Sequence, residues 1–335
     1  MFAARGLGIW LVILGHGLLV ARNWLPDPAT EPCLWAVTRW VYAFHMPMFF
    51  LLAVWASRTF SEDAGFGTTV RRRAERLLVP YLVFTALVSL VKTWVPQLAT
   101  AQVEAGAGFL DQVLLHPRAN PMSVLWFLYT MFFVSVLGAT LAPGRPGRVP
   151  RWATLAVLVA AQALPEFDNL LGARDLLTFG LFWWIGYAFP DAWNRVALRP
   201  PAWAWLSVAA VPALQFGLED LVPRFLLMAV TGVAGTVMVL CVGRALLDHV
   251  PRRLADGVCR LGRNSMRVYL VSYFVEQGLR ISLRAVAGSA VPGWAFVLLD
   301  ALANPFLALA LAAAMARVPF AARLAFGEPP PRRPL

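Results

Sequence analysis

The first apolar segment of the chain carries an arginine and a histidine with spacing suited to acid–base and anion chemistry. Arg5 opens the segment RGLGIWLVILGHG, and His16 follows eleven residues later. Eleven residues of α-helix correspond to about 1100° of rotation and about 16 Å of rise, so both side chains lie on one face. An imidazole at that depth of a membrane helix is costly and by default marks a functional or water-lined site. The competing interpretation is a neutral His16 hydrogen-bonded to a neighbouring helix.

A second histidine occupies a similar position in the next apolar segment, YAFHMPMFFLLAVWASR. His45 precedes Arg58 by thirteen residues, which places it about 20 Å from that end of a helix and near the depth of His16. Pro47 follows two residues later, where it is expected to bend the helix and free a carbonyl group. The competing interpretation for His45 is again a satisfied hydrogen bond between helices.

Basic residues crowd the entry to the third apolar segment, in RRRAERLLVPY over residues 71–81. Arg73 and Arg76 are three residues apart and are therefore expected on one helical face. Guanidinium groups bind phosphate in a bidentate manner, so this pair could hold a phosphorylated cofactor. The competing interpretation is a basic anchor at the membrane surface.

Length and composition indicate that membrane helices must position these residues. The chain has 335 residues, of which 59% are hydrophobic and 14% are charged, whereas soluble domains average about 45–50% and about 25%. Apolar runs of about 20 residues predict spanning helices and exclude the short strands of an outer-membrane barrel. We therefore predict an all-α, polytopic transmembrane helical bundle. Its ten spans are expected at about 6–24, 36–57, 77–95, 123–142, 152–165, 174–190, 203–218, 224–246, 264–287 and 294–316.

The distribution of basic residues predicts the orientation of this bundle. With ten spans, most of the 29 Lys and Arg residues fall on the side of the N-terminus, and cytoplasmic loops collect such residues. Both termini are therefore expected in the cytoplasm. We expect one membrane domain over residues 1–317 and a cytoplasmic tail rich in Pro and Arg over residues 318–335. Usage that is rich in Arg and poor in Lys suggests a GC-rich bacterial genome, and hence the bacterial inner membrane.

Other classes of function find little support in the sequence. The net charge of +11 is explained by attraction to anionic membrane lipid, and no folded basic module for nucleic acid is recognisable. The three cysteines, Cys33, Cys241 and Cys259, lack the spacing of a disulfide framework or a zinc site. We predict neither a nucleic-acid partner nor a metal.

Six segments, in this order, resemble the integral-membrane acyltransferase-3 family, which includes bacterial O-acetylases of polysaccharides and fucose 4-O-acetylase-like proteins. The first is the segment from Arg5 to His16. The others are FHMPMFF, RAERLLVPY, LWFLYTMFF from Leu125, FWWIGYAF from Phe182 and LGRNSMRVYL from Leu261. The chain departs from the family pattern at Ser272, where relatives often have a histidine.

The resemblance implies a ten-helix enzyme that takes an acyl group, usually acetyl, from cytoplasmic acetyl-CoA or another acyl-CoA. The acceptor would be a hydroxyl group of a cell-surface glycan, a glycolipid or a similar molecule. Acyl transfer to an alcohol needs a base for the hydroxyl proton, and imidazole is suited to that role. His16 is then the expected base or transient acyl carrier, and His45 the group that orients it or polarises the thioester carbonyl.

The implied reaction also assigns roles to residues near the two membrane surfaces. Arg5, Arg73 and Arg76 would hold the phosphates of coenzyme A on the cytoplasmic side. The acceptor would enter from the opposite side, where Trp126 and Tyr129 begin the fourth span. Aromatic rings suit sugar binding, and they are equally typical of the belts that line both membrane interfaces.

The main alternative is a proton-coupled secondary transporter or flippase of a small polar or lipid-linked substrate, because buried histidines also suit a proton pathway. Such proteins usually need an acidic relay within the membrane. Glu276 and Asp300 are expected toward the outer ends of their spans, and Asp168 and Asp175 in solvated outer loops. The lack of a central acid in the predicted spans therefore favours chemistry over transport.

Overall fold

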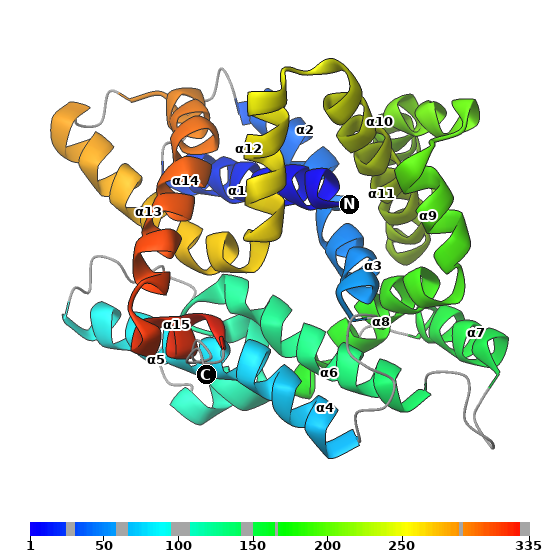
Figure 1. The fold of residues 1–335 in the computed structure, drawn as a ribbon, viewed down its shortest axis with the longest axis horizontal. Helices are drawn as coiled ribbons and strands as arrows, with labels where there is room; N and C mark the ends of the chain where they lie inside the picture. Colours follow the sequence, from blue (N-terminus) through cyan, green and yellow to red (C-terminus); the bar gives the residue numbers. More distant parts are fainter. Residues whose placement is uncertain are drawn as a thin grey trace, which may run out of the picture. The chain divides into compact units, whose positions relative to one another are not determined.

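The computed structural model describes residues 1–24, 31–57, 66–94, 108–141, 150–164, 167–287 and 291–328. Within these ranges the protein is helical and contains no strand (Figure 1), as its composition predicts. The α-helices are α1 (Phe2–Trp24), α2 (Glu31–Tyr42), α3 (His45–Ser57), α4 (Phe66–Arg73), α5 (Val79–Trp94), α6 (Trp126–Leu141), α7 (Arg151–Ala161), α8 (Ala173–Ala188), α9 (Pro190–Leu198), α10 (Ser207–Leu218), α11 (Arg224–His249), α12 (Arg252–Arg263), α13 (Ser265–Ala287), α14 (Gly293–Ala316) and α15 (Pro319–Phe326). Short π-helices cover Ala74–Leu78 and Asp111–Leu115, and 3₁₀ turns cover Pro117–Ala119, Ser123–Leu125, Leu170–Gly172 and Ala202–Leu206.

The chain folds as two compact units, and each is described by itself. The first unit consists of Met1–Leu52 with Phe189–Ala314, and the second of Ala53–Ala188 with Met315–Leu335. The two histidines singled out above belong to the first unit. The arginines that precede α5 and the aromatic residues that begin α6 belong to the second.

Helix α1 is the common neighbour in the first unit, where it packs against α2, α11, α12 and α13. Figure 1 shows α1 in blue beside α12 in yellow. Glycines allow their backbones to approach closely: a methyl group on Gly262 would lie 1.8 Å from the carbonyl oxygen of Phe2, and one on Gly6 would lie 2.1 Å from that of Val258. Helix α12 lies between two predicted spans and is amphipathic, so its apolar side packs on α1 while its arginines remain outside.

The second predicted span, residues 36–57, is a broken helix. Helix α2 ends at Tyr42 and α3 begins at His45. Pro47 has no N–H group to donate to the carbonyl of Ala43. The Thr231 hydroxyl lies 3.2 Å from that carbonyl oxygen and 2.7 Å from that of Leu227, so its hydrogen is shared between them. The freed carbonyl predicted from Pro47 is therefore confirmed.

The second unit packs α6 against α4 and α8, α7 against α8, and α15 against α5. Gly138 makes room for Trp183, because a methyl group on Gly138 would lie 2.1 Å from the indole ring. The segment expected as a cytoplasmic tail begins with helix α15, which is followed by Gly327 with a left-handed φ of 63°. Residues 329–335 of that predicted tail lie outside the described residues.

Five helical segments among the described residues are long and apolar enough to cross a membrane: Phe2–Asn23, Glu31–Val54, Phe66–Trp94, Arg224–His249 and Gly293–Ala316. A sixth candidate is the pair Pro190–Leu198 and Ala202–Leu218, which is bent by 83°. Helix α13 coincides with the predicted ninth span, but its arginines and glutamate lower its hydropathy. The membrane class is therefore supported, and the count of ten spans with both ends in the cytoplasm stays a prediction.

The close approach of α1 and α12 predicts a strong effect of Gly262→Ala on folding. The added methyl group would force the two backbones apart, and overpacking of this kind costs about 1–3 kcal/mol. We expect a lower thermal unfolding midpoint in detergent. Gly257→Ala is the matched control, because it lies on the same helix and nothing lies within 4 Å of its added methyl group. Equal midpoints for both variants would contradict the close contact.

Candidate functional site

Arg5 lies near the start of α1 and is anchored to the first turn of α13. Its Nη2 donates a hydrogen bond to the hydroxyl oxygen of Ser265 at 3.0 Å. The arginine remains partly exposed, so its guanidinium group combines a fixed position with a solvent-accessible surface. A guanidinium group in this situation can bind an anion without losing its protein partner.

His16 lies on α1 eleven residues beyond Arg5, and it differs from an ordinary buried histidine. The side chain keeps part of its surface accessible although its neighbours on the helix are mostly buried. None of the residues that the structure describes forms a hydrogen bond with its ring. The interpretation of His16 as a histidine satisfied by a neighbouring helix therefore finds no support. Its two ring nitrogens can accept or donate a proton to a ligand.

His45 has the opposite character, being buried with 1% of its surface exposed. Its Nδ1 lies 2.9 Å from the carbonyl oxygen of Val41, and because a carbonyl only accepts, Nδ1 must be the donor. The ring of Tyr42 meets it edge-on, with 4.6 Å between ring centroids. His45 also lies close enough to His16 for the two rings to interact electrostatically. The break between α2 and α3 thus holds one imidazole in a fixed orientation beside a second that is unpartnered.

Two acidic residues of the first unit are buried, contrary to the sequence-based expectation. Glu276 on α13 is 5% exposed, and Asp300 on α14 is 0% exposed. They were expected near the outer ends of their spans because each lies far from the predicted cytoplasmic end of its helix. The packing of α13 and α14 on α1 encloses them instead. The argument against a transporter from a lack of buried acids was therefore wrong.

The structure separates the environments of Arg73 and Arg76. Arg73 is buried whereas Arg76 is exposed, although their charges still interact. The π-helix Ala74–Leu78 begins directly after Arg73 and contains Arg76, and it replaces the regular turn that the prediction of one shared face assumed. Of the two arginines, Arg76 is therefore the one accessible to solvent.

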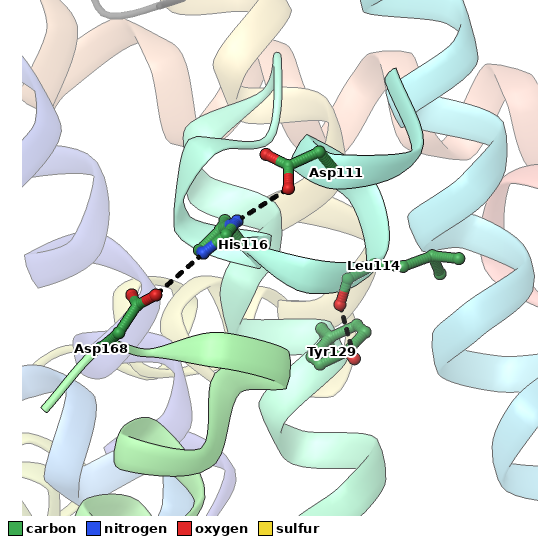
Figure 2. A network of polar contacts seen from close by, with 5 residues as sticks. All are labelled: Asp111, Leu114, His116, Tyr129 and Asp168. Carbon is green, nitrogen blue, oxygen red and sulfur yellow. Dashed lines mark hydrogen bonds and ion pairs between the residues drawn. The ribbon is translucent and has the colours of Figure 1, made fainter. Parts of the chain in front are cut away.

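Trp126 and Tyr129 hold the segment of residues 108–125 in place. The guanidinium group of Arg118 lies 4.2 Å from the centroid of the Trp126 ring. The Tyr129 hydroxyl donates to the carbonyl oxygen of Leu114 at 3.0 Å (Figure 2). From α5, the Tyr81 hydroxyl donates to the carbonyl oxygen of Val113 at 2.5 Å. These contacts give both predicted substrate-binding side chains a clear role in shaping this segment.

An ion pair links the 108–125 segment to the first turn of α8. Arg118 binds Asp175 through two hydrogen bonds, Nε to Oδ2 at 2.8 Å and Nη2 to Oδ1 at 2.6 Å. Asn169 donates to the same carboxylate at 2.8 Å. Asp175 is buried, so the expectation that it is merely solvated was wrong.

His116 bridges two carboxylates at the surface of the second unit. Figure 2 shows the imidazole between Asp111 and Asp168, with Nδ1 3.1 Å from Asp111 and Nε2 3.2 Å from Asp168. The hydrogen bond to Asp168, followed by that to Asp111, raises the pKa of His116 above its ordinary value. In its doubly protonated form, the imidazolium donates to both carboxylates and clamps together two segments distant in sequence.

Comparison with known proteins assigns the chain to a family. A family model described as an acyltransferase domain matches residues 3–317. The chain belongs to the acyltransferase-3 family. It is also similar to nodulation protein NolL from Mesorhizobium japonicum, with 25% identity over 215 residues, covering 63% of this chain and 53% of NolL. The chain thus matches about half the length of that curated relative. No solved structure matches.

Ser272 is the position at which the sequence was expected to depart from the acyltransferase-3 pattern. Its hydroxyl donates to the carbonyl oxygen of Tyr269 in the same helix at 3.0 Å, and the side chain is buried. The backbone carbonyl of Ser272 accepts a hydrogen bond from Asn304 at 3.1 Å. The backbone of Ser272 therefore links α13 to α14.

The His116 clamp predicts a pH-dependent order of the 108–125 segment in this acyltransferase domain. Because the folded-state pKa is raised, the clamp is complete below the unfolded pKa of about 6.5 and is lost as pH rises through the folded value. We expect hydrogen exchange in this segment, corrected for intrinsic rates, to increase above that pH. His116→Gln should abolish the pH-dependent step, and a step of the same size in that variant would exclude the clamp.

Proposed function

We propose that the protein is a membrane O-acyltransferase that moves an acetyl or other acyl group from acyl-CoA to a hydroxyl group of a glycan, glycolipid or similar acceptor. The observation that carries the proposal is the unpartnered, partly exposed imidazole of His16 on the helix that also presents Arg5. Because the chain belongs to an acyltransferase family, acyl transfer is the reaction in which we propose that His16 and Arg5 take part. The bacterial inner membrane is the proposed location.

In the proposed reaction, His16 accepts the proton of the acceptor hydroxyl while its oxygen attacks the thioester carbonyl carbon. A new carbon–oxygen bond forms and the carbon–sulfur bond breaks. The proton passes from His16 to the leaving sulfur, so coenzyme A departs as the thiol. We favour this direct transfer over an acyl-His16 intermediate, which would produce ping-pong kinetics. His45, with its fixed ring, would keep His16 oriented.

The phosphates of the donor are assigned to arginines. Arg5 is accessible and fixed by Ser265, and a guanidinium group at about 16 Å of helix rise from His16 suits an acyl carrier with a long flexible arm. Arg73 and Arg76, in the second unit, are proposed as further phosphate ligands. Trp126 and Tyr129 are proposed to act on the acceptor through the 108–125 segment that they support.

Replacing the proposed base tests the function directly. His16→Ala should lower kcat by about 10²-fold or more, the usual contribution of general-base catalysis, without loss of folding in membranes. His249→Ala is the matched control, because that histidine is exposed at the end of α11. Full activity of His16→Ala would overturn the assignment. Solute uptake by proteoliposomes without any acyl donor would instead support the transporter, which the buried acids favour.

A second test concerns the donor site. Arg5→Ala should weaken acyl-CoA binding by about tenfold, the loss expected for a charge-assisted hydrogen bond. The difference from wild type should shrink as salt rises, because ions screen phosphate contacts. Arg71→Ala, which removes an exposed arginine paired with Glu75, is the control. Equal dissociation constants for wild type and Arg5→Ala in low salt would argue against the site.

A further inference from the structure

Helices α1 and α13 run in parallel and in register. At one end, Arg5 hydrogen-bonds to Ser265. Toward the other end, Leu279 and Leu283 pack against the cluster that contains Leu18 and Ala21. The two contacts place the starts of α1 and α13 together and their later parts in one cluster, so the helices run in the same direction. The hydrogen bond between Arg5 and Ser265 sets the register of α1 against α13.

This register brings Glu276 to the level of His16. His16 lies eleven residues after Arg5, and Glu276 lies eleven residues after Ser265. Both helices advance by the same rise and nearly a whole number of turns over that distance. Because Arg5 and Ser265 face each other, His16 and Glu276 are directed to the same interface at the same level.

Glu276 is enclosed at this level with few partners in its own helix. It is 5% exposed, and its Oε1 accepts a hydrogen bond from Gln277 at 3.2 Å. A buried carboxylate is costly unless it has hydrogen-bond donors or a positive partner. An imidazole N–H at the same level can supply that donor.

Asp300 on α14 brings a second carboxyl group against α1 at Gly17, the residue after His16. Its Oδ1 accepts a hydrogen bond from Asn304 at 2.8 Å, and its Oδ2 is buried without a partner among the described residues. A methyl group on Gly17 would lie 2.8 Å from that Oδ2. The residue next to His16 is therefore a glycine whose missing side chain makes room for the carboxylate.

Other titratable side chains lie near His16 and Glu276. Tyr42 and His45 approach from the break between α2 and α3, and Tyr42 interacts electrostatically with Glu276. Tyr273 and Arg280 lie on α13 itself and interact with Glu276. Carboxyl groups from α13 and α14 thus approach α1 near the level of His16.

The structure shows no hydrogen bond from a described residue to the His16 ring. Resting on the proposed function, we propose that in the bilayer Glu276 becomes the positioning residue of His16: it accepts a hydrogen bond from one ring nitrogen so that the other faces the reacting hydroxyl, and Asp300 supports it. When His16 takes the hydroxyl proton, Glu276 stabilises the imidazolium and keeps its orientation. The proton then leaves His16 for the sulfur of coenzyme A. Glu276 stays ionised throughout, so the only proton transferred is the one that His16 carries from the hydroxyl group to the sulfur.

Kinetics of conservative variants test this role. Glu276→Gln should lower kcat by about 10²-fold or more while the KM for acetyl-CoA changes by less than about threefold. Glu276→Asp, which restores a carboxylate, should recover part of that loss, and Asp300→Asn should have a smaller effect. Asp248→Asn is the charge control, because Asp248 forms an exposed ion pair with Arg244. A kcat for Glu276→Gln within threefold of wild type would overturn the proposal.

Nuclear magnetic resonance of the histidine ring nitrogens tests the proposal without an assay of enzymatic activity. The chain has 4 histidines, so ¹⁵N-histidine labelling in nanodiscs gives few signals, and His16→Ala assigns the one of interest. His16 should show a single tautomer in wild type and Glu276→Asp, and averaged ring-nitrogen shifts in Glu276→Gln. Unchanged shifts in Glu276→Gln would exclude the contact. If His16→Ala is inactive and these shifts do not change, only this inference fails; if His16→Ala is fully active, the proposed function fails.

Discussion

The packing of α1 is the constraint on which the first unit depends. Ionisable side chains on apolar helices are costly unless neighbouring helices hold them against partners or a polar cavity. Gly6 and Gly262 bring α12 against the first turns of α1, and Ser265 anchors Arg5. With that end fixed, the level and direction of His16 follow from helix geometry alone. A shift of one residue in this packing would turn the imidazole by about 100°.

Within this frame the two histidines have different environments because their helices differ. Helix α1 continues through His16, so its backbone groups are satisfied within the helix and the ring is left without a described partner. His45 begins a new helix after a break, and the carbonyl of Val41 accepts its Nδ1 proton. One imidazole is thus held by the backbone while the other remains available. Two similar residues at similar depth therefore suit different tasks.

The sequence predicted the parts of this arrangement that depend on local pattern. The helical class, the single face shared by Arg5 and His16, and the carbonyl freed by Pro47 all follow from spacing within one segment. The burial of Glu276 and Asp300 did not, because it depends on the register between helices far apart in the chain. Arg73 and Arg76 were assigned to one face on the assumption of a regular helix, which the π-helix breaks. Asp300 and Asn304 are polar residues four apart in an apolar run, a spacing that places them on one helical face. This pattern could have predicted a buried polar contact on α14 but was not used.

The layer around His16 also has a consequence for biosynthesis. Its members come from the first 45 residues and from positions 276 and 300, so they are separated by most of the chain of 335 residues. During translation α1 enters the membrane long before α13 and α14 exist, and its polar stripe has no acidic neighbours until synthesis is nearly finished. Contacts of such high sequence separation form late. Chains that terminate early therefore retain the histidines but lack the acidic half of their surroundings.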